Sequence, residues 1–475
     1  MTDAQPRDDS VGDAAPMRVL VAIAYYGTAN REYLLQLLDA YQAMTYDVDI
    51  VILTEAAKGL DGVEEIIGLP IEDPYSLPFA HKQLFLDRRD DYDLFIYSED
   101  DTLVGQDAIE AFLWATDMLP DDKIAGFLRT EESPDGSLRC SSVHNHFHWT
   151  PDSVSSIGGE LWGHFSNPHG AVFMLTREQL ARQIDGGCFD RPARLGRYSM
   201  RVTAATDPYT QCGAEKVLCL SRMDDFLLPH LSNRYLNTLG LSLEEFLRQA
   251  ERLGETVTGD VDTRRLFHPT VDLDDNRWDK RFYGAPRDGV LDAVPRRATR
   301  VLSLGMGSGD AEAQLMERGH EVVGIPLDDI IAGLAQSRGI ETTAPDLDDA
   351  IAALSDRRFD AVLAINTLPF FERPVDVVKR LAALVEPGGT IVATAPNTRN
   401  LRIRARFGKN PQPIPSDGFA GVGVHPASPG DVKRWLRDAG CAAVQLRFTE
   451  SSRPPAPAAL LGADVIATAT MGSSS

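Results

Sequence analysis

The stretch Leu94-Phe95-Ile96-Tyr97-Ser98-Glu99-Asp100-Asp101-Thr102 decides how the first half of the sequence is interpreted. It begins with apolar and aromatic residues, a composition typical of a buried strand in a parallel sheet. It ends with three consecutive carboxylates, which such a strand would deliver to the ligand-binding edge of an α/β sheet. Because neighbouring carboxylates repel one another, we expect a hard divalent cation among them. The alternative is an acidic turn at a strand end, since short acidic motifs are common.

The residues before this stretch predict a β-α-β unit. Val19–Ala24 is an apolar run suited to a central strand, a helical pattern follows, and Val48–Thr54 predicts a second strand. This arrangement would place Tyr25 and Tyr26 at a strand tip. Either ring could stack on a nucleobase there, or pack at the rim of the core.

The segment Glu99–Asp101 resembles the Asp-x-Asp metal motif of GT-A glycosyltransferases, which implies a GT-A-like domain that binds a nucleotide sugar. The resemblance implies that Asp101 binds Mn²⁺ or Mg²⁺ on the diphosphate and that Glu99 lies near the ribose and the metal. It also implies that His230 completes the metal shell and that Lys82 contacts phosphate or acts as a base. The plainer interpretation of Lys82 is a solvated side chain on a helix.

The same resemblance makes Asp207 and Glu215 candidates for a catalytic base or for a group that orients the acceptor. An inverting transfer needs a base to take the proton of the acceptor hydroxyl, and a retaining transfer needs none in that position. The sequence does not choose between these outcomes. Each carboxylate could instead be a solvated helix cap.

Two histidine-containing segments could line an acceptor pocket. The loop Trp162–Gly170 resembles the acceptor-side strand of GT-A folds and would turn Asn167 and His169 toward the sugar. Three histidines at positions 144, 146 and 148 alternate, so a strand would place them on one face. That face could bind a metal or form a polar groove for the acceptor, and we favour the groove.

Length and charge limit the classes of protein. A chain of 475 residues predicts two or three domains, and 43% hydrophobic with 25% charged residues is ordinary for a globular protein. The formal net charge of −23 argues against nucleic acid or an anionic membrane as the main partner. No apolar run reaches the roughly 18 residues of a membrane span.

The cysteines and the first residues bear on the cellular compartment. Five cysteines form no C-x-x-C pair, so we expect neither a disulfide framework nor a zinc site. Residues 1–16 are polar and acidic without the apolar core of a secretory signal, and we interpret them as a disordered tail. These features favour the cytoplasm.

The second half of the sequence contains a glycine-rich turn. Arg287–Arg297 mixes Pro, Gly and charge, as an interdomain connection does. In Arg300–Asp310, an apolar strand is followed by Gly305, Gly307 and Gly309 and then by a helical pattern. Glycines at that point let the backbone approach a ligand at a helix N-terminus.

Three further strands are predicted after this turn, at Glu321–Ile325, Phe359–Asn366 and Leu384–Ala393, the last with a Pro-Gly-Gly turn. This order is similar to class I S-adenosylmethionine-dependent methyltransferases over most of residues 300–448. The resemblance implies a Rossmann-like domain whose three glycines lie against S-adenosylmethionine.

The sequence departs from that family at three places. Ser303 and Pro326 stand where the family usually has acids, and Asp328 or Asp329 could substitute for the second of these. Leu368-Pro369-Phe370 replaces the usual Leu-Glu-His, so the general base common in related enzymes is missing. A lost ribose-binding acid weakens cofactor binding. The domain is therefore predicted either to be an active methyltransferase or to be a degenerate domain that serves as a scaffold or binds the acceptor.

The sequence therefore predicts an α/β protein with two domains. They are a GT-A-like domain at 17–285 and a class I methyltransferase-like domain at 300–475, joined by a linker at 286–299. The expected function is metal-dependent transfer of a sugar from a nucleotide sugar to a glycan or natural-product acceptor, which the second domain would methylate. The alternatives are a methyltransferase whose first domain only binds sugar or nucleotide, and a non-catalytic assembly protein.

Overall fold

We analysed a computed structural model of the chain. The structure describes residues 16–193, 198–236, 238, 240–259, 264–268, 271–273, 278–401, 405, 418–449 and 462–472. Residues 1–15, which hold nearly all of the predicted tail, lie outside this range.

A five-stranded sheet forms the centre of the first domain, in the order β10-β4-β1-β2-β3. Its strands are β1 (Arg18–Ala24), β2 (Asp47–Thr54), β3 (Glu64–Ile67), β4 (Leu94–Glu99) and β10 (Val172–Thr176). The first four run parallel and β10 runs antiparallel to β4. Residues 94–97 of β4 are completely buried, as their apolar sequence predicts, and Glu99 ends the strand at its carboxyl edge. The acidic cluster therefore lies where the sequence placed it.

Two four-stranded sheets extend this domain, in the orders β5-β11-β9-β8 and β12-β6-β7-β13. Their strands are β5 (Lys123–Ala125), β6 (Leu128–Glu132), β7 (Leu138–Cys140), β8 (Trp149–Ile157), β9 (Glu160–Phe165), β11 (Glu215–Cys219), β12 (Leu227–Pro229) and β13 (Leu241–Ser242). The helices of this half are α1 (Arg31–Gln42), α2 (Ala80–Asp87), α3 (Gln106–Met118), α4 (Arg177–Asp185), α5 (Met200–Ala204), α6 (Asp207–Thr210) and α7 (Leu243–Thr258). Residues 144–148, expected as a strand with three histidines on one face, form turns ahead of β8.

The second domain is built on a seven-stranded sheet in the order β16-β15-β14-β17-β18-β20-β19. Its strands are β14 (Arg300–Met306), β15 (Glu321–Pro326), β16 (Glu341–Thr342), β17 (Phe359–Ala364), β18 (Val385–Pro396), β19 (Ala442–Phe448) and β20 (Asp464–Thr470). Its helices are α8 (Asp310–Glu317), α9 (Asp329–Ser337), α10 (Leu347–Ala353), α11 (Pro374–Ala382), α13 (Phe419–Val422) and α14 (Pro429–Asp438). The four central strands predicted from the sequence are confirmed.

The strand order of the second sheet reverses between β14 and β17. From β14 the chain first moves outward to β15 and β16, and then returns to β17 on the other side of β14. In open α/β sheets a crevice forms at such a reversal, at the carboxyl ends of the strands. The glycine-rich turn that follows β14 opens into this crevice.

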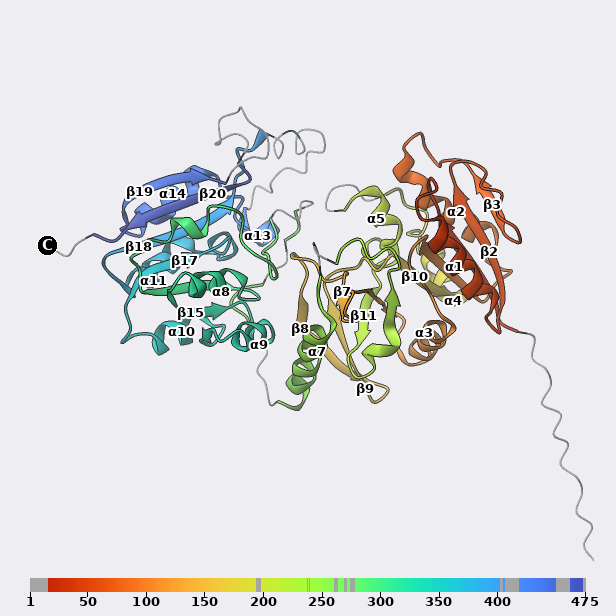
Figure 1. Ribbon diagram of the computed structural model, residues 1–475, viewed down its shortest axis with the longest axis horizontal. Coiled ribbons are helices and arrows are strands. Elements are labelled where there is room, and N and C mark those ends of the chain that lie inside the picture. The colour runs from red at the N-terminus through yellow and green to blue at the C-terminus, as the bar shows by residue number, and fades with distance from the viewer. Residues whose placement is uncertain are drawn as a thin grey trace, which may run out of the picture.

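The two domains share a hydrophobic core. In Figure 1, α9 of the second domain lies beside α7 of the first. Trp149 and Phe246 of the first domain belong to the same buried cluster as Leu327, Ile330 and Leu334 of the second. Because this apolar surface is buried from both sides, the domains stabilise one another.

Candidate functional site

The glycine-rich turn has the backbone that the sequence predicted. Gly305 and Gly309 have positive φ values of 73° and 84°, a region that favours glycine, and Gly309 caps the N-terminus of α8. Gly307 is required for a different reason, because a Cβ atom there would overlap the Phe282 carbonyl oxygen. The glycines thus let another group lie close to the backbone of the turn. In this structure that group is the Phe282 backbone.

Residues Lys280–Gly284, which we call the plug segment, lie over the glycine-rich turn. The Ser308 backbone N–H donates to the Phe282 carbonyl oxygen at 2.7 Å. The Gly284 N–H donates to the Asp310 carboxylate at 2.9 Å. The Lys280 ammonium donates to the Ile365 carbonyl oxygen at the end of β17.

The plug segment leaves little free space in the crevice. The cavity lined by the plug segment, the glycine-rich turn and residues 365 and 366 has a volume of about 50 Å³. Pockets for drug-sized ligands measure roughly 300–1,000 Å³. In this conformation the space between the plug segment and the glycine-rich turn does not accommodate S-adenosylmethionine.

Two buried charges lie along the plug segment. Burial lowers the pKa of Lys280 to about 7. Burial raises the pKa of Glu312, which accepts a hydrogen bond from the Ser303 hydroxyl at 2.5 Å. The family resemblance led us to expect an acid at position 303, where this chain has Ser303. Glu312 on α8 brings a carboxyl group next to that position.

Asp328, the predicted substitute for the ribose-binding acid, is used in another contact. Its carboxylate lies 2.8 Å from Nε2 of His148 in the first domain and also caps α9 by accepting the Ile331 N–H. Burial would raise the pKa of Asp328, but His148 and the backbone N–H groups of α9 outweigh burial and hold the pKa below its usual value. As the structure stands, the Asp328 carboxylate is not available to a ribose.

The comparisons with known proteins concern the methyltransferase fold. Residues 277–446 match the family model described as a methyltransferase domain. An uncharacterized methyltransferase of Mycobacterium tuberculosis is 31% identical over 123 residues, 25% of this chain and 48% of the relative. A ubiquinone biosynthesis O-methyltransferase of Dechloromonas aromatica is 29% identical over 115 residues, 23% of this chain and 50% of the relative. The chain spans about half the length of the curated relatives it matches.

Among solved structures, a SAM-dependent methyltransferase from Archaeoglobus fulgidus is 18% identical, with a TM-score of 0.30 over 37% of this chain and 87% of that chain. The matched family model, together with the seven-stranded sheet and its glycine-rich turn, gives the C-terminal domain a class I methyltransferase fold. The model match leaves residues 1–276 outside it.

Two carboxylates of the acidic cluster in the first domain lie beside basic side chains. Asp101 lies 3.2 Å from His230 Nε2 and 3.3 Å from Arg234 Nη2, and His230 Nδ1 lies 2.5 Å from the Glu131 carboxylate. Glu99 turns away from this group, toward Arg129 and toward His169, each at 3.8 Å. The structure thus brings together Asp101 and His230, two of the three residues predicted to bind a metal, and also brings His169 to Glu99.

The predicted Mn²⁺ or Mg²⁺ finds no support in this geometry. Across the described ranges, no group of three or more His, Cys, Asp or Glu side chains is arranged to hold a metal ion. Arg129 and Arg234 supply the positive charge that the sequence led us to assign to a metal. Both arginines were missed, because their distance along the chain from Glu99–Asp101 gives no local pattern.

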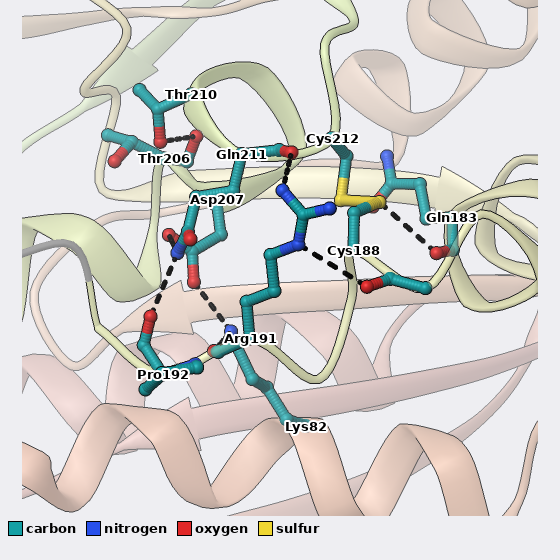
Figure 2. Close-up of a disulfide and its surroundings, with 11 residues drawn as sticks. Lys82, Gln183, Cys188, Arg191, Pro192, Thr206, Asp207, Thr210, Gln211 and Cys212 are labelled. Carbon is teal, nitrogen blue, oxygen red and sulfur yellow. Dashed lines mark hydrogen bonds and ion pairs between the residues drawn. A yellow bond between two sulfur atoms is a disulfide. The ribbon is translucent and has the colours of Figure 1, made fainter.

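Four other predicted residues have mainly structural partners. Lys82 and Asp207 are both buried and form an ion pair at 2.6 Å, which Figure 2 shows beside Arg191. Glu215 forms an ion pair with Lys123 at the start of β5 and β11. Tyr25 is completely buried. The burial of Tyr25 favours its plainer interpretation as packing. Lys82 and Asp207 are not the solvated side chains of their plainer interpretations, and their roles toward a substrate stay predictions.

Tyr26 and the cysteines complete the comparison with the sequence. Tyr26 is 54% exposed beyond β1, so its predicted stacking on a base remains a prediction. Cys188 and Cys212 form a disulfide, with Cα atoms 5.1 Å apart (Figure 2). The sequence analysis expected no disulfide framework and did not predict this single bridge. Of the described helices, none is long and apolar enough to cross a membrane.

Proposed function

We propose that this chain is an S-adenosylmethionine-dependent methyltransferase whose N-terminal domain binds a sugar or nucleotide portion of the acceptor. The match of residues 277–446 to a methyltransferase domain carries this proposal. The glycine-rich turn at the reversal of the sheet supports it, because such a turn presents backbone N–H groups to a ligand at a helix N-terminus. The closed crevice means that cofactor binding requires the plug segment to move.

Binding of the cofactor tests this proposal directly. We expect the full chain to be stabilised by S-adenosylmethionine and S-adenosylhomocysteine and not by ATP, which shares only the adenosine. A ligand that binds only the folded state at 100 times its Kd stabilises it by about 2.7 kcal/mol. Thermal unfolding and calorimetry measure this effect. The absence of any response to either cofactor form would contradict the proposal.

A second candidate function is transfer from a nucleotide sugar by the N-terminal domain. It is favoured by the contact of Asp101 with His230 at the carboxyl edge of β4, which pairs two residues singled out from the GT-A resemblance. Because Arg129 and Arg234 lie against Glu99 and Asp101, we expect a nucleotide sugar to bind without a divalent metal.

Calorimetry with UDP-, GDP- and dTDP-sugars in the presence of EDTA tests this second function. We expect one donor to bind the parent chain and Asp101→Asn to bind it at least tenfold more weakly. Asp107→Asn, on the exposed first turn of α3, is the control. If no donor binds, or if Asp101→Asn binds as the parent does, the N-terminal domain does not use this cluster for a nucleotide sugar.

A further inference from the structure

The plug segment joins the two domains through single residues. The Phe282 N–H donates to the Asn145 carbonyl oxygen of the first domain at 2.7 Å, and the Phe282 carbonyl accepts the Ser308 N–H of the second domain at 2.7 Å. One residue therefore spans the junction with both of its backbone groups. Whether Phe282 covers the glycine-rich turn therefore depends on its contact with the first domain.

His148 of the first domain holds the side chains of the plug segment. Its ring stacks on Phe282 with centroids 4.7 Å apart, and its Nδ1 lies 3.0 Å from the Tyr283 hydroxyl. The Tyr283 hydroxyl in turn donates to Gln249 of α7 at 2.9 Å. Phe282 and Tyr283 are 4% and 5% exposed, so both rings are fixed by packing as well.

The other side of His148 contacts the crevice itself. Its Nε2 atom lies 2.8 Å from the carboxylate of Asp328, which follows β15. A single imidazole therefore contacts both the plug segment and Asp328, one of the two acids predicted to replace the ribose ligand. Movement of the first domain would release both at once.

Lys280 closes the inner end of the crevice. Its ammonium contacts the Ile365 carbonyl and lies 3.2 Å from the Thr367 hydroxyl, below the end of β17. It is 4% exposed. The plug segment thus occupies the crevice from its entrance at Gly307 to the far side of the sheet reversal.

We propose that Lys280–Gly284 is an autoinhibitory plug, held by His148, that must leave the crevice before S-adenosylmethionine binds. This inference rests on the proposed methyltransferase function and adds its regulation. It gives the first domain a part in controlling access, because Asn145, His148 and Gln249, which contact Phe282 and Tyr283, all belong to it. A sugar or nucleotide bound by the first domain would then be able to open the crevice.

The test compares cofactor affinity in full-length chains by calorimetry. The variants are Phe282→Ala with Tyr283→Ala, which removes both anchoring rings, and separately Lys280→Ala, which clears the inner crevice and leaves the rings. Tyr75→Ala is the control, because Tyr75 is 55% exposed and lies on the first domain away from the crevice. Thermal unfolding identifies the variants that fold.

We expect each folded plug variant to bind S-adenosylmethionine at least tenfold more tightly than the parent, and the control to match the parent. In the parent, the cofactor should increase amide hydrogen exchange in residues 280–284. Equal affinity of parent and folded variants, with unchanged exchange, would overturn the plug and leave the methyltransferase proposal standing. Absence of binding in the parent and in every folded variant would overturn both.

Discussion

His148 Nε2 lies 2.8 Å from the Asp328 carboxylate, and this pair joins the two domains in a fully buried position. The side chains of His148 and Asp328 are 2% and 4% exposed. Removing one partner of a buried pair leaves the other charge uncompensated, which costs about 3–5 kcal/mol. The contact is therefore more sensitive to mutation than a surface ion pair.

His148→Ala should lower the free energy of unfolding by about 3 kcal/mol, because Asp328 loses its partner and Phe282 loses a stacked ring. Urea unfolding followed by circular dichroism measures the change. His164→Ala is the matched control, since Nδ1 of His164 lies 2.8 Å from the Lys216 carbonyl oxygen, within the first domain. A loss below about 0.5 kcal/mol for His148→Ala would show that the pair does not couple the domains.

The second prediction concerns the closest approach of the plug segment. Gly307→Ala places a methyl group against the Phe282 carbonyl oxygen, in a backbone conformation that alanine can adopt. We expect a destabilisation of about 1–3 kcal/mol, because overpacking forces the backbone apart. Gly105→Ala is the control, since a methyl group there meets no neighbour within 4 Å. If both substitutions lower the free energy of unfolding equally, the plug segment does not pack against the glycine-rich turn.

The fold of the second domain could be predicted because its signals are local. The apolar runs at β14, β15 and β17 and the glycines at 305–309 each lie within a few residues of one another. The plug segment gives no such signal. Lys280 and Phe282 act on residues 85 and 26 positions further along the chain, and only tertiary structure brings these groups together.

The site of the first domain was predicted only in part. The resemblance to GT-A glycosyltransferases singled out Asp101 and His230, and the structure brings them into contact. Arg129 and Arg234 escaped notice because an arginine in a sequence is usually exposed and carries no spacing pattern. The predicted metal followed from counting carboxylates without the cations that the fold places around them.

The third prediction is a pH dependence caused by Lys280. Its pKa is lowered by burial to about 7, whereas an unfolded lysine has a pKa of about 10.4. Between these values the unfolded chain binds more protons, so this group makes the fold more stable as pH rises. The destabilisation caused by burying the protonated Lys280 side chain is fully present below pH 7 and decreases progressively between pH 7 and about 10. Glu312 and Arg281 are the charged groups that act on it.

Lys280→Met removes this penalty, so its advantage over the parent should be about 2 kcal/mol larger at pH 6 than at pH 9. Urea unfolding at both pH values gives the difference. Lys433→Met, on α14, is the charge-matched control and should show no such change. A stability difference between Lys280→Met and parent that is the same at both pH values would show that Lys280 keeps its ordinary pKa in the folded chain.

The last prediction concerns the Cys188–Cys212 disulfide, which spans 24 positions and encloses α5 and α6. Closing a loop of this size in the unfolded chain stabilises the fold by about 3 kcal/mol. Cys188→Ser with Cys212→Ser should therefore lower the free energy of unfolding by about 2–3 kcal/mol. Titration of the denatured chain should find three reactive thiols without reductant and five with it, since Cys140, Cys219 and Cys441 are free. Five thiols without reductant would mean that the bridge does not form, and the double serine variant would then match the parent in stability.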